Sequence, residues 1–187
     1  MKKGTIILIA VIAVIVLLVS WVVGSYNGMM ALREETRTAW SGIENNLQRR
    51  SDLIPNLVET VKGYAEHETE IFTAVADARS KLIGAGSTAE SAEANDELSG
   101  ALSRLLAISE SYPELKADQN FRQLQDELAG TENRIARSRE EYNTTAASYN
   151  KRVQAFPAVI FAGMLGFERA DYFEAAAGAS EVPNVSF

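Results

Sequence analysis

An uninterrupted apolar run near the N-terminus is the strongest pattern in the chain. Every position of residues 6–23 is apolar except Ser20, and Lys2 and Lys3 precede the run. As an α-helix such a run spans about 27 Å, close to the ~30 Å hydrocarbon core of a bilayer. The pattern predicts a transmembrane helix that contacts membrane lipid through residues 5–23. A cleaved signal peptide is the alternative, although the run is longer than the usual hydrophobic region of such peptides.

Basic residues on either side of the run indicate its orientation. Lys2 and Lys3 lie on one side, whereas Arg33 and Arg37 follow at a greater distance and share their segment with acidic residues. The positive-inside rule counts Lys and Arg, so it favours a cytoplasmic N-terminus. The rest of the chain is then expected in a periplasm or at a cell surface.

Beyond the run, residues 33–82 show a heptad repeat of apolar positions and no strand-like alternation, which predicts a long helix. The apolar positions form two rows. The first row holds Trp40, Leu47, Ile54, Val61, Val75 and Leu82, and the companion row holds Ile43, Leu57, Tyr64, Ile71 and Ala78. Glu68 interrupts the first row and Arg50 interrupts the companion row.

Pro55 falls within this repeat without shifting its phase. A proline in a helix interior costs about 3 kcal/mol, because it removes a hydrogen bond and clashes with the preceding turn. Two interpretations follow: a kinked but continuous helix, or a second helix that is capped by Ser51 or Asp52 and has Pro55 in its first turn. The unbroken phase favours the continuous helix.

The second half of the chain predicts two further helices. Gly84 ends the first long helix, residues 90–111 form the next, and Pro113 breaks it. Asp118 is expected to cap a last long helix, which runs to Phe156 before Pro157 stops it. Its inward row consists of Phe121, Leu128, Ile135, Tyr142, Tyr149 and Phe156.

These elements predict an all-α fold: an N-terminal transmembrane helix followed by an elongated antiparallel three- to four-helix bundle. Segments 26–84 and 90–156 are nearly equal in length, so one long hairpin would return residues 157–167 to the membrane or the bundle base. A tight turn at Ser51 would instead give a shorter bundle of four segments. The expected division is a cytoplasmic stub and anchor (1–25), a helical domain (26–173) and a mobile C-terminal tail (174–187).

Composition narrows the candidate functions. The chain has 187 residues, a formal net charge of −7, no cysteine and one histidine, His67. Disulfides, thiolate sites and multi-histidine metal sites are therefore excluded, and an acidic chain is a poor partner for nucleic acid. We expect no cofactor, no metal and no catalytic activity, because the sequence brings no two carboxylates to one pocket.

Three blocks carry an unusual pattern. The first holds Trp40, the run Arg49-Arg50-Ser51-Asp52-Leu53-Ile54-Pro55-Asn56, and Gly63-Tyr64; the second holds Phe121, Gln125, Glu132 and Asn133; the third holds Tyr142-Asn143, Tyr149-Asn150 and Phe156-Pro157. Together these blocks resemble the LemA family, and the resemblance covers nearly everything from Tyr26 to Phe173. It implies a bacterial single-pass membrane protein with an all-helical domain. It implies no reaction, although some relatives belong to magnetosome membranes and others accompany membrane proteases.

The polar residues of these blocks leave two interpretations open. Gln125, Glu132 and Arg139 recur at seven-residue steps, and the first block adds its arginines and Asp52. They either form a buried or half-buried network that fixes helix register, which we favour, or a partner-binding face.

The sequence as a whole predicts a membrane-anchored scaffold or interaction protein of the bacterial cell envelope. We expect it in the inner membrane, as a homo-oligomer or with a membrane-protein partner such as a protease or envelope complex. The alternative is a sensory module that binds a ligand or an envelope polymer.

Overall fold

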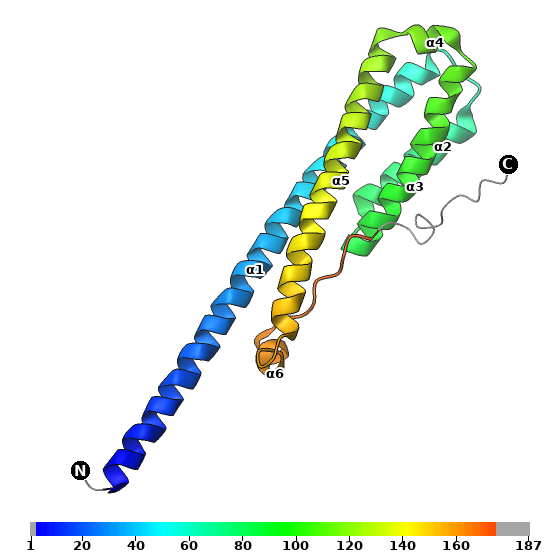
Figure 1. The fold of residues 1–187 in the computed structure, drawn as a ribbon. Coiled ribbons are helices and arrows are strands. Elements are labelled where there is room, and N and C mark those ends of the chain that lie inside the picture. Colours follow the sequence, from blue (N-terminus) through cyan, green and yellow to red (C-terminus); the bar gives the residue numbers. More distant parts are fainter. Residues whose placement is uncertain (1–2, 175–187) are drawn as a thin grey trace, which may run out of the picture. The chain divides into compact units, whose positions relative to one another are not determined.

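The computed structural model describes residues 3–174, which form helices and loops without a strand (Figure 1). The elements are α1 (Lys3–Lys62), α2 (Thr69–Gly84), α3 (Thr88–Ala107), the 3₁₀ turn η1 (Ile108–Glu110), α4 (Pro113–Ala117), α5 (Gln119–Gln154), α6 (Val159–Ala162) and η2 (Gly163–Leu165). The predicted all-α fold is confirmed. The predicted mobile tail falls, apart from Glu174, outside the described residues.

The chain divides into two compact units. Among the described residues, the anchor unit comprises 3–38 and 144–170, and the bundle unit comprises 39–143 and 171–174. Helices α1 and α5 each contribute residues to both units.

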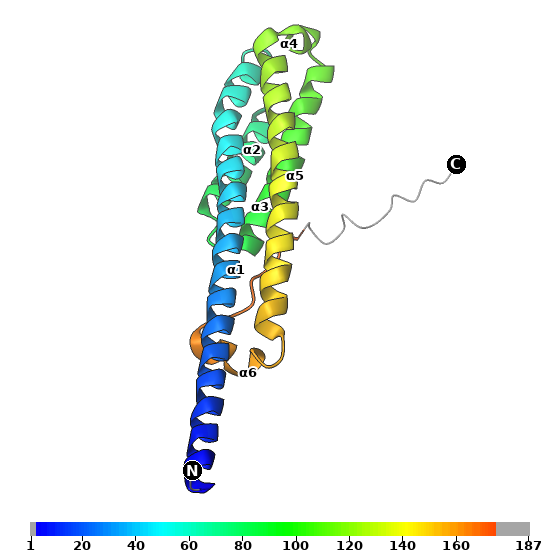
Figure 2. The ribbon, with the colours of Figure 1, turned by 60° about the vertical axis from the view of Figure 1, so that its left-hand side comes forward.

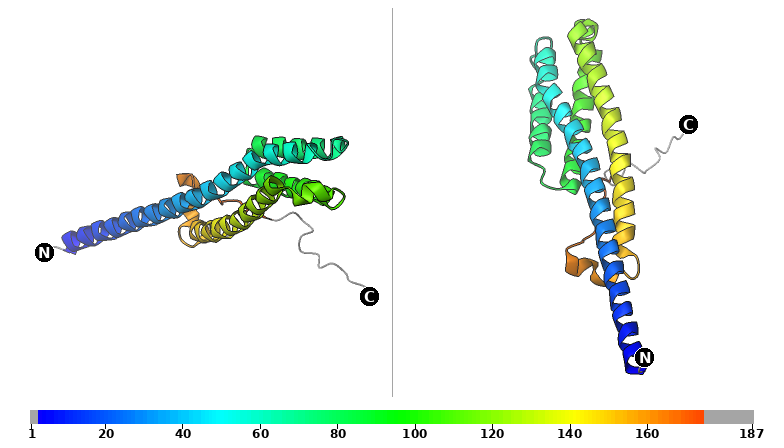
Figure 3. Two further views of the ribbon diagram at one scale, coloured as in Figure 1. Left: turned by 90° about the horizontal axis from the view of Figure 1, so that it is seen from above. Right: turned by 90° about the vertical axis from the view of Figure 1, so that its left-hand side faces the viewer.

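The bundle unit is an antiparallel arrangement of four helical segments. Arg79 of α2 donates from Nε to the Ser51 carbonyl of α1 at 2.9 Å, and Lys81 of α2 lies 2.7 Å from Glu97 of α3. Helices α2 and α3 run side by side (Figures 1 and 3). Asn46 of α1 donates to Ser138 Oγ of α5 at 3.0 Å, so α5 closes the group.

Its core comes from the heptad rows. The buried members share small exposed fractions and lie along all four helices: Ile43, Leu47, Ile54, Leu57, Val61, Val75, Ala78, Leu82, Leu98, Leu105, Phe121, Leu128 and Ile135. The helical period therefore identified most of this core, since residues three or four apart share a helix face. Tyr64 is 38% exposed and Ile71 is only half-buried, so the companion row fails where the chain reverses.

Pro55 lies inside α1, which confirms the interpretation of one continuous helix. The expected extension of that helix to Leu82 is wrong, because α1 ends at Lys62 and the chain reverses through Gly63 to Glu68. The expected nearly equal arms, and the alternative turn at Ser51, are wrong for the same reason.

Local chemistry explains the position of this reversal. Gly63 weakens a helix, and Glu68 is the one charged residue in the first heptad row. The reversal brings α2 back against α1, with the Lys62 ammonium 5.7 Å from the centre of the Phe72 ring. A continuous heptad phase is thus compatible with two helices that fold against each other.

Two predicted helix boundaries, at Gly84 and Asp118, are confirmed, whereas the helix predicted over residues 90–111 runs from Thr88 to Ala107. α2 ends at Gly84, and Ser87 caps α3 by accepting from the Glu90 N–H at 3.2 Å. Asp118 caps α5, as predicted, by accepting from the Phe121 N–H at 2.8 Å. The reversals between α1 and α2 and between α3 and α5 lie at one end of the bundle unit (Figure 2).

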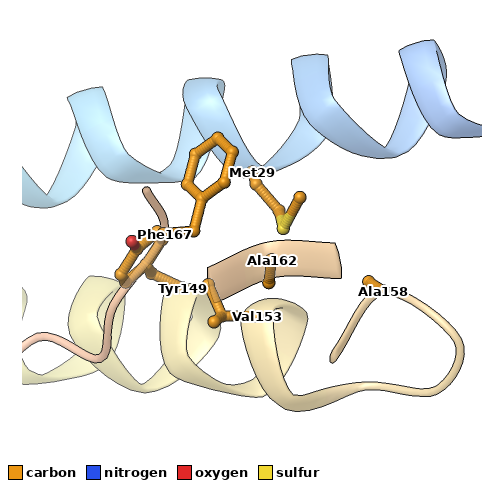
Figure 4. Close-up of a cluster of buried hydrophobic side chains, with 6 residues drawn as sticks. All are labelled: Met29, Tyr149, Val153, Ala158, Ala162 and Phe167. Carbon is orange, nitrogen blue, oxygen red and sulfur yellow. The ribbon is translucent and has the colours of Figure 1, made fainter. Parts of the chain in front are cut away.

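In the anchor unit, α1 contains one segment long and apolar enough to cross a membrane, and residues 3–24 are all exposed. Above this segment a small core forms around Met29, which points toward Ala162 (Figure 4). Tyr149, Val153, Ala158 and Phe167 complete the cluster. Helix α1 therefore passes from an exposed apolar span into a small core that α5 and the segment around α6 complete.

Candidate functional site

Arg50 is the buried charge at which α1, α3 and α5 of the bundle unit meet. The residue is 5% exposed. Its Nη1 donates to Asn95 Oδ1 at 2.6 Å and lies 2.8 Å from Glu132 Oε2, while Nη2 donates to Ser99 Oγ at 3.0 Å. One guanidinium thus joins three helices through a planar set of donors.

The electrostatics of this cluster depend on its partners. Burial lowers the pKa of Arg50, because the protein interior solvates the charged form less well than water, while the negative charges of Glu132 and Asp96 oppose the shift. Arg50 Nε is buried and has no hydrogen-bond partner among the described residues. The Glu132 side chain is 50% exposed, so water also reaches the ion pair.

An open groove of about 570 Å³ adjoins Arg50. Leu102, Leu128 and Gln125 line it together with Glu132. Polar and apolar side chains therefore meet in an open groove that Arg50 lines in part, although its side chain is only 6% exposed.

Around Pro55 the motif has a buried side, with Ser51 and Ile54, and an exposed side. Arg49 is exposed, and its Nη2 lies 3.9 Å from Glu127 Oε2. Asp52 Oδ1 accepts a hydrogen bond from Gln48 Nε2 at 2.8 Å. Pro55 and Asn56 are exposed. This part of the motif is a surface, which we call the outer motif face (Arg49, Asp52, Pro55 and Asn56).

Gly63 and Tyr64 form the reversal after α1. The Gly63 N–H donates to the Glu59 carbonyl at 3.3 Å, and Tyr64 Oη donates to Asp118 Oδ2 at 3.1 Å. The hydrogen bond from the Phe121 N–H is the main reason that the pKa of Asp118 lies below its usual value. The hydrogen bond to Asp118 raises the pKa of Tyr64. The first block is therefore linked to the start of α5.

Along α5 the predicted residues separate. Phe121 is buried, and Gln125 is half-buried beside the groove. Asn133 is exposed and Arg139 is half-buried. Of the three polar residues at seven-residue steps, the structure places Glu132 against the buried guanidinium and Gln125 in the adjoining groove.

Trp40, Tyr142 and Phe173 pack together in the bundle unit, with the Trp40 ring centre 5.4 Å from that of Tyr142 and 6.1 Å from that of Phe173. The side-chain amide of Asn143 makes two hydrogen bonds with the Phe173 backbone. Its Oδ1 accepts from the Phe173 N–H at 2.9 Å, and its Nδ2 donates to the Phe173 carbonyl at 3.0 Å. Tyr142 Oη donates to the Asp171 carbonyl at 2.8 Å, and burial raises the pKa of Tyr142.

The same device occurs seven residues later, within the anchor unit. Asn150 is 2% exposed and makes two 2.8 Å hydrogen bonds with the backbone of Ala170, one to its carbonyl and one from its N–H. Tyr149 is buried in the cluster with Val153 and Phe167. Each Tyr-Asn pair therefore supplies a ring to a core and an amide to an extended backbone segment.

The prediction that Phe156 faces inward is wrong. Its side chain is 82% exposed, because α5 ends at Gln154 and the helical row ends with it. Pro157, which follows through a cis peptide bond, is half-buried.

Within residues 3–174, no group of three or more His, Asp and Glu side chains is arranged to hold a metal ion. Three polar residues of the blocks hold helices or backbone: Arg50, Asn143 and Asn150. In a comparison with known protein families, residues 39–187 match the LemA family. The chain belongs to the LemA family. The resemblance noted in the sequence is thereby confirmed.

Individual relatives of this LemA-family chain carry two kinds of name. It is 29% identical to magnetosome protein MamQ 2 of Paramagnetospirillum magneticum, over 80% of this chain and 64% of that protein. It is 28% identical to magnetosome protein MamQ of Magnetospirillum gryphiswaldense, over 92% and 74% respectively. Protein LemA of Metamycoplasma hominis is 29% identical over 72% of this chain and 62% of that protein. The chain thus spans less than two thirds of the first of these relatives.

Sequence reasoning missed two parts of the LemA arrangement. Asn95 and Ser99, which receive the Arg50 guanidinium, belong to none of the three blocks; the available signal was a pair of polar residues at helical spacing beside the apolar row of α3. The backbone at Ala170 and Phe173 was also missed, because backbone acceptors leave no trace in the sequence.

Proposed function

We propose that this LemA-family chain is a membrane-anchored helical scaffold or interaction protein of the bacterial cell envelope. The observation that carries the proposal is the use made of the family's polar residues. Arg50 joins three helices, while Asn143 and Asn150 each hold a backbone segment. Groups bound in this way stabilise a defined helical surface, which is what an interaction protein presents to a partner.

The exposed apolar segment of α1 supports membrane anchoring, and two relatives are named as magnetosome proteins. We place the N-terminus in the cytoplasm of a single-pass inner-membrane protein, with the helical units outside, because Lys2 and Lys3 precede the span. The region after the span then holds 16 basic and 25 acidic side chains, a net charge of −9. Protease treatment of spheroplasts tests this topology, since a protected C-terminal tag would contradict it.

We assign the buried cluster at Arg50 to helix register and the outer motif face to partner binding. The variant Arg49→Ala/Asn56→Ala should keep the wild-type melting temperature and lose a crosslinked partner in cells. The matched variant Arg50→Ala/Asn95→Ala should lower the melting temperature. If the first pair leaves crosslinking unchanged, the outer motif face is not the binding surface.

The scaffold itself is tested on the full-length protein in detergent by size-exclusion chromatography with light scattering. We expect a homo-oligomer, or a membrane-protein partner recovered after crosslinking in cells. Monomeric behaviour together with no crosslinked partner would contradict the proposal.

The groove beside Arg50 supports a second candidate, a sensory module for an anionic ligand or an envelope polymer. Its buried guanidinium lies against a hollow of about 570 Å³. Binding to the folded state would raise the melting temperature. An unchanged melting temperature across lipids, cell-wall fragments and metal ions would exclude this candidate.

A further inference from the structure

Large apolar side chains are exposed on the chain around α6, in the anchor unit. We define the α6 patch as Phe156 (82% exposed), Val159 (49%), Ile160 (67%), Met164 (84%) and Leu165 (41%). Such a concentration of exposed apolar side chains in about ten residues marks an interaction surface.

The opposite side of the same segment is fixed to α1. Ala158 and Ala162 are buried in the cluster around Met29, and Figure 4 shows the Met29 side chain pointing toward the helix turn that carries Ala162. The Phe161 ring centre lies 5.5 Å from that of Trp21, edge to face, and the Phe167 ring centre lies 5.3 Å from that of Tyr26. The segment is therefore held alongside residues 21–29 of α1.

This position coincides with the edge of the proposed bilayer. A hydrocarbon core of ~30 Å takes about 20 residues of an upright helix, so a span that begins after Lys3 ends near Val23. The headgroup region adds about 5–7 Å on each side, which corresponds to about four more residues. Residues 21–27 thus cross from the hydrocarbon edge to the outer limit of the headgroups, and Gly28 follows at that limit. Trp21 and Tyr26 are the residue types that favour this zone.

Positive charge lies above the patch within the same unit. A Cβ atom at Gly28 would lie 3.4 Å from Arg152 Nη2, so this exposed guanidinium is at the height of the headgroups. Arg33 lies over the Phe167 ring, 5.0 Å from its centre. Apolar side chains below cations are the arrangement by which a segment lies in a membrane interface.

We propose that the α6 patch inserts into the interface of the leaflet that faces the helical units, as a second lipid contact of the same chain. The inference rests on the proposed membrane anchoring. Lipid is the occupant that the structure favours, because Phe161, within the segment that carries the patch, packs against Trp21 in the exposed apolar stretch of α1. A span alone leaves the anchor unit able to tilt and rotate relative to the bilayer. A span together with an interfacial segment would fix both its tilt and its rotation.

The absence of cysteine permits a direct test on the full-length protein. Single variants Ile160→Cys and Met164→Cys carry an environment-sensitive fluorophore in vesicles of phosphatidylcholine and phosphatidylglycerol. Leu17→Cys reports on the span, and Ala147→Cys is an exposed control on α5 in the same unit. Quenching is compared among lipids that carry a shallow nitroxide, lipids that carry a deep nitroxide, and aqueous iodide.

We expect the labels at positions 160 and 164 to be quenched by the shallow nitroxide at least twice as strongly as the label at position 147, with blue-shifted emission. Quenching by iodide equal to that at position 147 would overturn the inference, because the patch would then be in water. Protection from both lipid and iodide would also overturn it, since a protein would cover the patch. Absence of nitroxide quenching at position 17 would instead overturn the membrane anchoring on which the inference rests.

Discussion

The buried cluster around Arg50 makes a quantitative prediction about the stability of the bundle unit. In the variant Glu132→Ala the arginine keeps its charge but loses its ionised partner, and its side chain is only 6% exposed. Breaking a fully buried ion pair in this way costs about 3–5 kcal/mol. Because the Glu132 side chain is half exposed, water can enter the vacated space, so we expect a loss of about 2–3 kcal/mol.

Removing the charge itself should cost no more than removing its partner. Arg50→Met leaves the Glu132 carboxylate free to return to water and places an apolar chain of similar reach among the three helices. The remaining penalty is the Asn95 carbonyl oxygen, buried in a residue that is 3% exposed, which loses its donor at a cost of about 1–3 kcal/mol. The double variant Arg50→Met/Glu132→Ala should therefore be no less stable than Arg50→Met alone.

Denaturant unfolding of the full-length protein in detergent, followed by far-UV circular dichroism, gives the free energies of unfolding. The control Glu127→Ala removes a weak exposed contact of 3.9 Å with Arg49 and should change stability by less than about 0.5 kcal/mol. The reasoning is refuted if Glu132→Ala matches this control, or if the double variant with Arg50→Met costs the sum of its two single variants.

Three further predictions concern other parts of the chain. Asn143→Ala removes both hydrogen bonds to the Phe173 backbone, so it should lower the free energy of unfolding by about 1–3 kcal/mol and remove the hydrogen-exchange protection of the Phe173 N–H. The control Asn133→Ala, at an exposed position of the same helix, should leave stability unchanged. Gly166 has φ of 75°, so Gly166→Ala should destabilise the protein by about 1–2 kcal/mol in a thermal melt, while Gly100→Ala in α3, where a new Cβ meets open space, should stabilise it by about 0.5–1 kcal/mol. The pKa of Asp118 is lowered in the folded state, so its contribution to stability is present above its unfolded pKa of about 3.9 and is lost as the pH falls through the folded value. Melting temperatures measured from pH 5 to about pH 2.5 should consequently fall less steeply for Asp118→Asn, which keeps an acceptor but does not titrate; an equal slope would contradict this assignment.

Local signals located several helix ends correctly. Asp118 caps α5, and Gly84 ends α2, because each acts through its own backbone and the next turn. Pro55 stayed inside α1 because the apolar rows on both sides kept one phase, which indicated burial of one helix face. Such effects depend on neighbours within a few residues, so a single sequence contains them.

Two positions show where local signals failed. The heptad rows continue past Lys62, yet the chain reverses at Gly63, because a row specifies which face is buried and not which helix covers it. Phe156 continued the row of α5 in the sequence, but the helix ends at Gln154 and leaves the ring exposed.

The sequence by itself determined that this protein is helical, that residues 6–23 are apolar enough to span a membrane, and which residues carry the family pattern. These properties follow from hydrophobicity and from a periodicity of 3.6 residues, which are local quantities. The tertiary structure decided that Arg50 joins three helices, that Asn143 and Asn150 hold backbone, and that Phe161, in the segment of the α6 patch, packs against Trp21. Those contacts join residues from 20 to about 140 positions apart, and only packing in three dimensions selects such partners.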